Sequence, residues 1–233
     1  IKCTFEPMKS LQLIFRYIKY LFRAKSKHSA QAPFLYELIT QVIDKTTDDN
    51  SCKNIEALRK ELCTQERTIK ITDFGAGSTI NNSKTRKVKD VAKNSAKNAK
   101  FGKLLYRIIQ FYKPKNILEL GTSLGISTSY LAKADANAHV FTFEGCPETA
   151  KIAQENFDKQ NITNTSITLG DFNLTLSEKL KEIETVDLAF IDGNHQEKPT
   201  IAYFEECLKY ANNNTIFIFD DIHWSDGMEN AWN

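Results

Sequence analysis

The stretch from Asn116 to Gly125, NILELGTSLG, decides the fold of this chain. It is an apolar, β-rich run that ends in a glycine turn, and a helical pattern follows from about Ser127, which is typical of a strand, a turn and a helix in succession. Gly121 and Gly125 allow a ligand to approach the backbone closely, and the start of a helix offers N–H groups to an anion. The spacing G-x-x-x-G is not that of a dinucleotide-binding turn, and the Lys of a phosphate-binding loop does not follow it. Both of those nucleotide sites are therefore disfavoured.

Four more apolar, β-rich runs follow this stretch, at 138–144, 166–170, 186–192 and 215–221. Helical stretches separate them, and strands that alternate with helices of this length predict βαβ units with right-handed crossovers. We therefore expect an α/β domain over residues 84–233 with a doubly wound, mostly parallel, Rossmann-like sheet. Ligands of such sheets bind beyond the carboxyl ends of the strands.

We expect residues 1–83 to form a helical N-terminal extension with a lid or cap region. Residues 11–23 have the pattern of a basic amphipathic helix, for which docking on the domain or on a partner subunit is favoured over contact with a membrane surface. Residues 34–43 are expected to be helical. Residues 69–78 read as a short strand that enters a glycine turn, either a structural turn or part of the lid.

The charge of the chain is divided unevenly along its length. The chain has 233 residues, 41% of them hydrophobic and 26% charged, which is typical of a globular protein and excludes disordered, collagen-like and membrane-spanning classes. Residues 1–143 carry 25 Lys and Arg against 12 Asp and Glu, whereas residues 144–233 carry 6 against 17, so the two parts have net charges of +13 and −11. Nine of the basic residues lie in 84–107, where we expect one long helix with a solvated basic face.

The location of the protein is inferred from its cysteines and its apolar runs. The five cysteines have neither the spacing of a zinc site nor that of a disulfide framework. The apolar runs are too short to span a membrane, and the N-terminal region lacks the pattern of a secretory signal. These observations predict a cytoplasmic protein.

Polar residues stand at the ends of the second and third predicted strands. Glu144 ends the second strand, where a carboxylate can accept hydrogen bonds from both hydroxyls of a ribose. Asp171 follows the third strand and could accept from an exocyclic amino group, while Phe172 could lie against a ring. Together these residues predict a pocket for an adenosine whose remaining part is not a polyphosphate, because acidic groups dominate where phosphates need cations.

Class I S-adenosylmethionine-dependent methyltransferases have successive motifs that resemble four segments of this chain: ILELGTSLG, FTFEG, LGDF and FIDGNH. The resemblance covers about residues 100–233. The segments IDGNH and FDDIHW are most similar to those of small-molecule O-methyltransferases of the catechol O-methyltransferase type. The resemblance implies S-adenosylmethionine as cofactor, with contacts from Glu119, Gly121, Thr122, Ser123, Gly125, Ser127, Glu144, Gly145, Gly170, Asp171, Phe172 and Asp192.

The resemblance also implies a divalent cation such as Mg²⁺, held after the fourth and fifth strands by Asp192, Asp220 and Asp221. Asp221 stands where the family usually has Asn. Three carboxylates at converging strand ends suit a hard cation. The alternative is that one of them binds the cofactor or caps a helix while the others are solvated.

A second departure from the family concerns proton transfer. His195 stands where these enzymes carry a Lys, three residues after Asp192. We expect His195 and Asp192 to be catalytic, since an imidazole can take the proton of an acceptor hydroxyl as the methyl group transfers. His223 is a second candidate for the base, and Trp224 could form a wall of the acceptor pocket.

We therefore predict O-methylation of a small-molecule acceptor, with a homodimer left open as an assembly. The alternatives are a nucleic-acid methyltransferase that uses 84–107, although no nucleic acid is expected as partner, and a non-catalytic interaction module. A nicotinamide oxidoreductase is disfavoured by the glycine spacing. The family's sheet usually ends in an antiparallel hairpin, which is expected to be missing from this chain unless the protein continues past Asn233.

Overall fold

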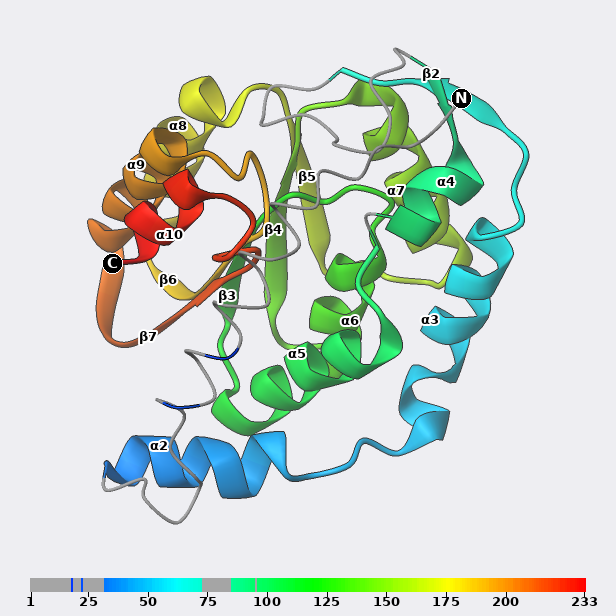
Figure 1. Ribbon diagram of the computed structural model, residues 1–233. Coiled ribbons are helices and arrows are strands. Elements are labelled where there is room, and N and C mark those ends of the chain that lie inside the picture. Colours follow the sequence, from blue (N-terminus) through cyan, green and yellow to red (C-terminus); the bar gives the residue numbers. More distant parts are fainter. Residues whose placement is uncertain (1–17, 19–21, 23–31, 73–84, 95) are drawn as a thin grey trace. The chain divides into compact units, whose positions relative to one another are not determined.

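The computed structural model describes residues 18, 22, 32–72, 85–94 and 96–233 (Figure 1). The chain divides into two compact units, Ile1–Lys45 and Thr46–Asn233. In the first unit the described residues form helix α2 (Pro33–Glu37) and the π-helical segment η2 (Leu38–Ile43). This agrees with the predicted helix at 34–43. The predicted helix at 11–23 lies outside the described residues, apart from Ile18 and Phe22.

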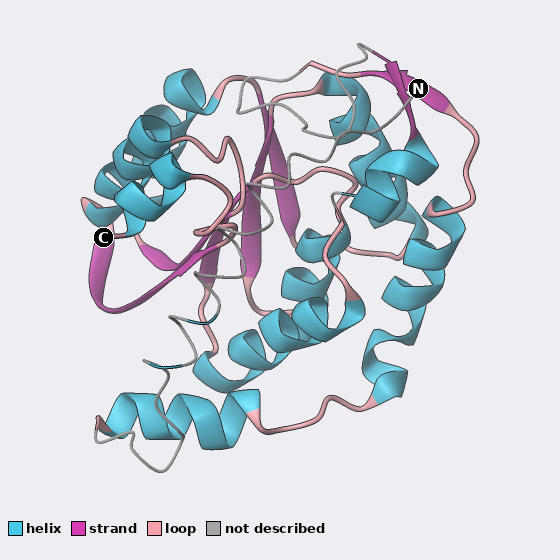
Figure 2. Cartoon of the chain, viewed as in Figure 1, coloured by secondary structure: helices cyan, strands magenta, loops and turns pink. Residues whose placement is uncertain are grey.

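A five-stranded parallel sheet forms the centre of the second unit (Figure 2). Its strands are β3 (Asn116–Leu120), β4 (His139–Glu144), β5 (Thr165–Leu169), β6 (Val186–Ile191) and β7 (Ala211–Phe219). All five predicted strands are confirmed, and β7 begins four residues earlier than the predicted 215. The strand order is β5-β4-β3-β6-β7, and all neighbours are parallel.

The direction of winding reverses between β3 and β6, because the chain builds outward from β3 to β5 and then returns to β6 and β7. The carboxyl ends of β3 and β6 are therefore adjacent, with Leu120 paired to Ile191. In open α/β sheets this reversal point is where ligands bind.

Helices cover both faces of the sheet, as the doubly wound prediction requires. On one face lie α8 (Phe172–Ile183) and α9 (Glu197–Leu208), with α10 (Asp226–Trp232) beside α9. On the other face lie α5 (Ala99–Tyr112), α6 (Ile126–Ala134) and α7 (Pro147–Lys159) (Figure 1). In the described part of the chain no strand follows β7. No helix among the described residues is long and apolar enough to cross a membrane.

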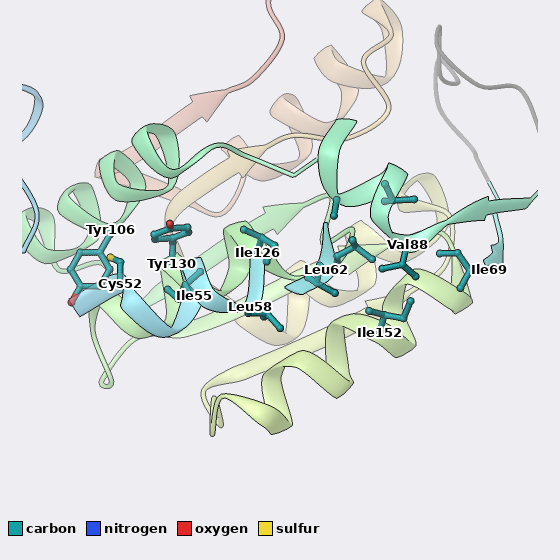
Figure 3. Packing of buried hydrophobic residues seen from close by; sticks show 13 residues of the cluster. Cys52, Ile55, Leu58, Leu62, Ile69, Val88, Tyr106, Ile126, Tyr130 and Ile152 are labelled. Atoms are coloured by element: carbon teal, nitrogen blue, oxygen red, sulfur yellow. The ribbon is translucent and has the colours of Figure 1, made fainter. Parts of the chain in front are cut away.

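A buried hydrophobic cluster joins the segment that precedes β3 to the helices α6 and α7 (Figure 3). Helix α3 (Asp49–Leu62) contributes Cys52, Ile55, Leu58 and Leu62, which pack with Tyr130 of α6 and Ile152 of α7. Strand β1 (Thr68–Lys70) adds Ile69. The predicted domain boundary at 83/84 stays a prediction, whereas the compact units divide at 45/46.

The prediction of one long helix over 84–107 is wrong. Residues Thr85–Lys87 form β2, which pairs antiparallel with β1, and α4 (Val88–Asn94) follows directly. Helix α5 starts afresh because the side chain of Asn98 accepts a hydrogen bond from the N–H of Phe101 at 3.0 Å. An Asn that caps a new helix competes with continuation of the old one. Seven of the nine basic residues are therefore distributed over β2, α4 and α5 rather than along one helix, Lys97 directly precedes α5, and Lys84 lies outside the described residues.

Candidate functional site

A cavity of about 530 Å³ opens at the carboxyl ends of β3, β4, β5 and β6. It lies where the winding of the sheet reverses. Most of the predicted site residues line it: Gly121, Thr122, Ser123, Ser127, Glu144, Gly145, Gly170, Asp171, Phe172, Asp192, His195 and Asp221. Trp224, the predicted wall residue, lines it as well. The topology thus brings together residues that are up to 103 positions apart, from Gly121 to Trp224.

The turn after β3 depends on a close approach between two strand ends. Gly121 has a φ of +110°, and a Cβ built on it would lie 2.3 Å from the backbone oxygen of Asp192. The N–H of Asp192 donates in turn to the carbonyl of Leu120 at 2.9 Å. Only glycine satisfies both the positive φ and this contact. The turn therefore places the backbone of residues 121–123 directly beside the end of β6.

Glu144 at the end of β4 is fixed by backbone donors. Its Oε2 accepts from the N–H of Ser123 at 2.7 Å, and its Oε1 accepts from the N–H of Cys146 at 2.8 Å. Burial raises the pKa of Glu144, although these N–H groups favour its charged form. Each carboxylate oxygen has a further lone pair, so both can also accept from a ligand hydroxyl.

Asp171 and Phe172 follow β5 and have different surroundings. Asp171 caps α8, since its Oδ1 accepts from the N–H of Asn173 at 2.9 Å. Phe172 lies edge-on to Phe143 and to Tyr203, with ring centroids 6.1 and 5.8 Å apart. The aromatic side chain is therefore held in a defined orientation beside the cavity.

Three predicted residues, Glu119, Gly125 and Asp220, are not among those that line the cavity. Glu119 is fully buried beneath the turn and accepts from the hydroxyls of Thr128 and Thr142, the latter at 2.6 Å. Burial raises the pKa of Glu119 to about 6. This geometry gives Glu119 a supporting position under the turn rather than one on the cavity wall.

Lys97 joins the acidic side chains after β6 and β7, and sequence reasoning missed it. Its Nζ lies 3.0 Å from Oδ1 of Asp192 and also contacts Oδ2 of Asp220. The three side chains are only 16%, 11% and 13% exposed, and Lys97 and Asp192 line the cavity. One signal could have located Lys97: it directly precedes Asn98, a residue type that starts helices, in the middle of the basic run.

The charges of this group are strongly coupled. Burial raises the pKa of Asp192 well above its ordinary value. Burial acts the same way on Asp220, but hydrogen bonds from Asp192 and Lys97 outweigh it and the pKa of Asp220 is lowered. Burial lowers the pKa of Lys97, and the two acidic neighbours more than offset this, so its pKa is raised. The ammonium group of Lys97 is therefore charged at neutral pH.

The side chain of His195 lies between those of Asp192 and Asp221, next to the cluster formed by Lys97, Asp192 and Asp220. Its Nε2 is 3.8 Å from Oδ1 of Asp192 and 3.9 Å from Oδ2 of Asp221. The ring of Trp224 is 6.5 Å away, centroid to centroid. Asn194, His195 and Asp221 all have positive φ values, and such backbone strain in non-glycine residues is concentrated at functional sites. His223 does not line the cavity; it is exposed and contacts Glu229 at 3.0 Å.

Two of the three carboxylates that the resemblance assigns to a cation contact a lysine in this structure. The ammonium group of Lys97 forms ion pairs with the carboxylates of Asp192 and Asp220, while the side chain of Asp221 is 43% exposed. Within residues 32–72, 85–94 and 96–233, no three Asp, Glu, His or Cys side chains come together as a metal site. The predicted cation site of Asp192, Asp220 and Asp221 therefore stays a prediction. An ammonium group already supplies the positive charge between two of them.

Comparison with known proteins shows what this fold and part of this sequence are similar to. Residues 118–222 match the family model described as "Methyltransferase domain". The fold is that of an O-methyltransferase from Bacillus cereus solved in complex with SAH, with a TM-score of 0.57 and 20% identity over 89% of this chain and 86% of that one. The O-methyltransferase TomG from Streptomyces achromogenes, solved in complex with SAM, gives a TM-score of 0.53 and 19% identity over 90% and 84% of the two chains.

Curated proteins make the relationship more specific. Catechol O-methyltransferase from Niastella koreensis is 33% identical over 124 residues, which is 52% of this chain and 55% of that protein. Catechol O-methyltransferase from Mus musculus is 26% identical over 126 residues, 52% of this chain and 47% of that protein. This chain spans about half the length of these relatives. Residues 118–222 are thus similar to a methyltransferase domain, and about half of the chain is similar to catechol O-methyltransferases.

Proposed function

We propose that this chain is an S-adenosylmethionine-dependent methyltransferase that acts on an oxygen atom of a small-molecule acceptor. The observation that carries the proposal is the cavity at the reversal point of the sheet, with Glu144, Asp171 and Asp192 at three successive strand ends around it. The relatives and the matched domain favour the same chemistry. The acidic character of residues 144–233 also suits a cofactor with a positively charged sulfonium.

In this proposal the cofactor lies across the carboxyl ends of β3, β4 and β5. Glu144 accepts from the ribose hydroxyls, since its oxygens are fixed by Ser123 and Cys146 and retain free lone pairs. The glycine turn at Gly121 lies on the cavity wall, where its backbone would face the cofactor. Phe172 provides an apolar surface for the adenine ring. When bound, the cofactor supplies the electrophilic methyl group.

His195 is proposed to act as the base. It faces the cavity, and its imidazole would accept the proton of the acceptor hydroxyl as the bond from that oxygen to the methyl carbon forms and the sulfur–methyl bond breaks. Asp192, 3.8 Å from its Nε2, would favour the protonated ring that results. Trp224 forms a wall for the acceptor. Alignment of the two reactants by these residues supplies much of the rate.

Calorimetric titration with S-adenosylmethionine tests the proposed cofactor site. Glu144→Ala removes acceptors for the ribose, and hydrogen bonds to a charged group are worth about 2 kcal/mol, so its Kd should rise about 30-fold. Glu148→Ala, an exposed carboxylate in the first turn of α7, is the matched control and should bind like the unmodified protein. A folded protein that does not bind S-adenosylmethionine, or unchanged binding by Glu144→Ala, would refute the assignment.

A screen for acceptors tests the reaction itself. Phenols, sugars and carboxylates are offered together with a methyl donor labelled in its methyl group. Transfer of the label to an oxygen of any of these compounds supports the proposal. Binding of the cofactor with transfer to none of them, and to nucleic acid instead, would favour a different acceptor class.

A further inference from the structure

The cation of this active site is a side chain of the protein. We propose that Lys97 takes the place of the divalent metal ion and that methyl transfer by this chain needs no metal. The inference rests on the proposed function. It also predicts whether Asp192 and Asp220 bind metal ions. Metal binding can be measured independently of any enzymatic activity.

The position of Lys97 is determined by the start of α5. The cap made by Asn98 fixes the backbone at the residue that follows Lys97. From there the lysine side chain reaches Asp192 and Asp220, which are 95 and 123 positions away in the sequence. All three side chains are largely buried. An exposed ion pair between a lysine and a carboxylate would not support the proposal, because such pairs form easily and contribute little to stability.

Charge balance explains why the ammonium group and a divalent ion are alternatives. Two neighbouring buried carboxylates repel each other and need a compensating positive charge. Lys97 provides that charge at 3.0 Å from Asp192 and in contact with Asp220. A divalent ion at the same place would have to displace the ammonium group and would then lie beside a second buried positive charge. The described residues offer no group of three metal-ligating side chains to offset that cost.

Lys97 is also placed to act on the acceptor. It lines the cavity together with His195 and Asp192. A lysine ammonium has three N–H groups, and the contacts to Asp192 and Asp220 use two of them. The third can donate to the acceptor oxygen while His195 takes the proton from it. Negative charge that develops on this oxygen is then stabilised by a fixed positive charge in a buried site.

The test uses the full chain and Mn²⁺ as the probe. After treatment with EDTA and its removal, Mn²⁺ is titrated into the protein and free Mn²⁺ is followed by electron paramagnetic resonance. The unmodified protein should bind no Mn²⁺ at equimolar, millimolar concentrations. Lys97→Met, which keeps the length but removes the charge, should gain a site, whereas Lys100→Met, an exposed lysine of α5, should not. Stoichiometric binding of Mn²⁺ by the unmodified protein that Asp220→Asn abolishes would overturn the proposal.

Turnover provides the second readout. With an acceptor from the screen, the unmodified protein should keep its full rate in excess EDTA, and Lys97→Met should be slower by on the order of 10²- to 10³-fold. A rate that EDTA abolishes and Mg²⁺ restores would overturn the proposal. If Lys97→Met does not fold, the two measurements on the unmodified protein still decide. Titration with S-adenosylmethionine is run in parallel, because its failure would refute the proposed function and not the Mn²⁺ result.

Discussion

Glu119 is a buried carboxylate whose protonation is linked to folding. Its pKa is raised to about 6 by burial, against an ordinary value of 4.5. The folded state therefore binds this proton more tightly than the unfolded state does. The stability that Glu119 contributes is highest at low pH and is lost as the pH rises from 4.5 through about 6. A shift of this size corresponds to about 2 kcal/mol.

Glu119→Gln should remove this pH dependence. Its amide oxygen can still accept from Thr128 and Thr142, but it does not ionise. The free energy of unfolding of the variant, relative to the unmodified protein, should rise by about 2 kcal/mol between pH 4 and pH 7. Urea denaturation at a series of pH values measures it. If the free energy of unfolding depends on pH in the same way for the two proteins, Glu119 has the same pKa in the folded and the unfolded state.

His195 and His223 provide a matched pair of variants for the proton-transfer step. His195→Ala should lower kcat by roughly 10² to 10⁴ and leave the Kd for S-adenosylmethionine nearly unchanged, because a base acts on the acceptor and not on the cofactor. His223→Ala should have the normal rate, since His223 is exposed and lies off the cavity. Steady-state kinetics and calorimetry separate the two effects. A normal rate for His195→Ala would mean that a group other than His195 takes the proton from the acceptor hydroxyl.

At the scale of elements, the strands of the five-stranded sheet could be predicted from the sequence, whereas the division of residues 85–112 into β2, α4 and α5 could not. The five strands are β-rich runs bounded by turns, and β3, β4 and β6 are largely buried, so such runs have few alternatives. The residues at their ends follow from topology, since parallel strands bring their carboxyl ends to one edge. By contrast, β2 has only three residues, and the break between α4 and α5 is short. Asn98 marks the start of a helix next to Lys97, but the local pattern does not show its partners Asp192 and Asp220, which follow β6 and β7.

The packing of α5 against α6 depends on Gly102. A Cβ at this position would lie 2.2 Å from the ring of Tyr130, which is fully buried and bonded through its hydroxyl to Glu56. Gly102→Ala should therefore destabilise the protein by about 1 to 3 kcal/mol, despite the gain in helix propensity. Gly227→Ala in α10 is the control, since its Cβ would make only an ordinary contact at 3.4 Å to Glu197. Equal stability of both variants in chemical denaturation would mean that Tyr130 can move aside.

At the scale of the whole molecule, two boundaries compete for the start of the domain that binds the cofactor. The sequence pattern predicts residue 84, whereas the compact unit begins at Thr46. The residues between them include α3 and β1, whose Cys52, Ile55 and Ile69 are at most 1% exposed. The sequence analysis places this segment in a helical extension with a lid or cap region, because the alternation of strands and helices becomes evident only from Asn116. Burial against residues far along the chain cannot be read from a local pattern.

Two shortened chains distinguish the boundaries. A chain of residues 46–233 keeps the buried cluster of Figure 3 and every residue that lines the cavity, so it should fold cooperatively and bind S-adenosylmethionine with a Kd within about twofold of the full chain. A chain of residues 84–233 lacks α3 and β1 and exposes the surfaces of α6 and α7 that these elements contact, including those of the cluster members Tyr130 and Ile152. Loss of several buried aliphatic side chains, each worth about 1.5 to 3 kcal/mol, exceeds much of the stability of a typical domain. Thermal unfolding and calorimetry of both chains measure this, and a stable, cofactor-binding 84–233 chain would support the boundary at residue 84.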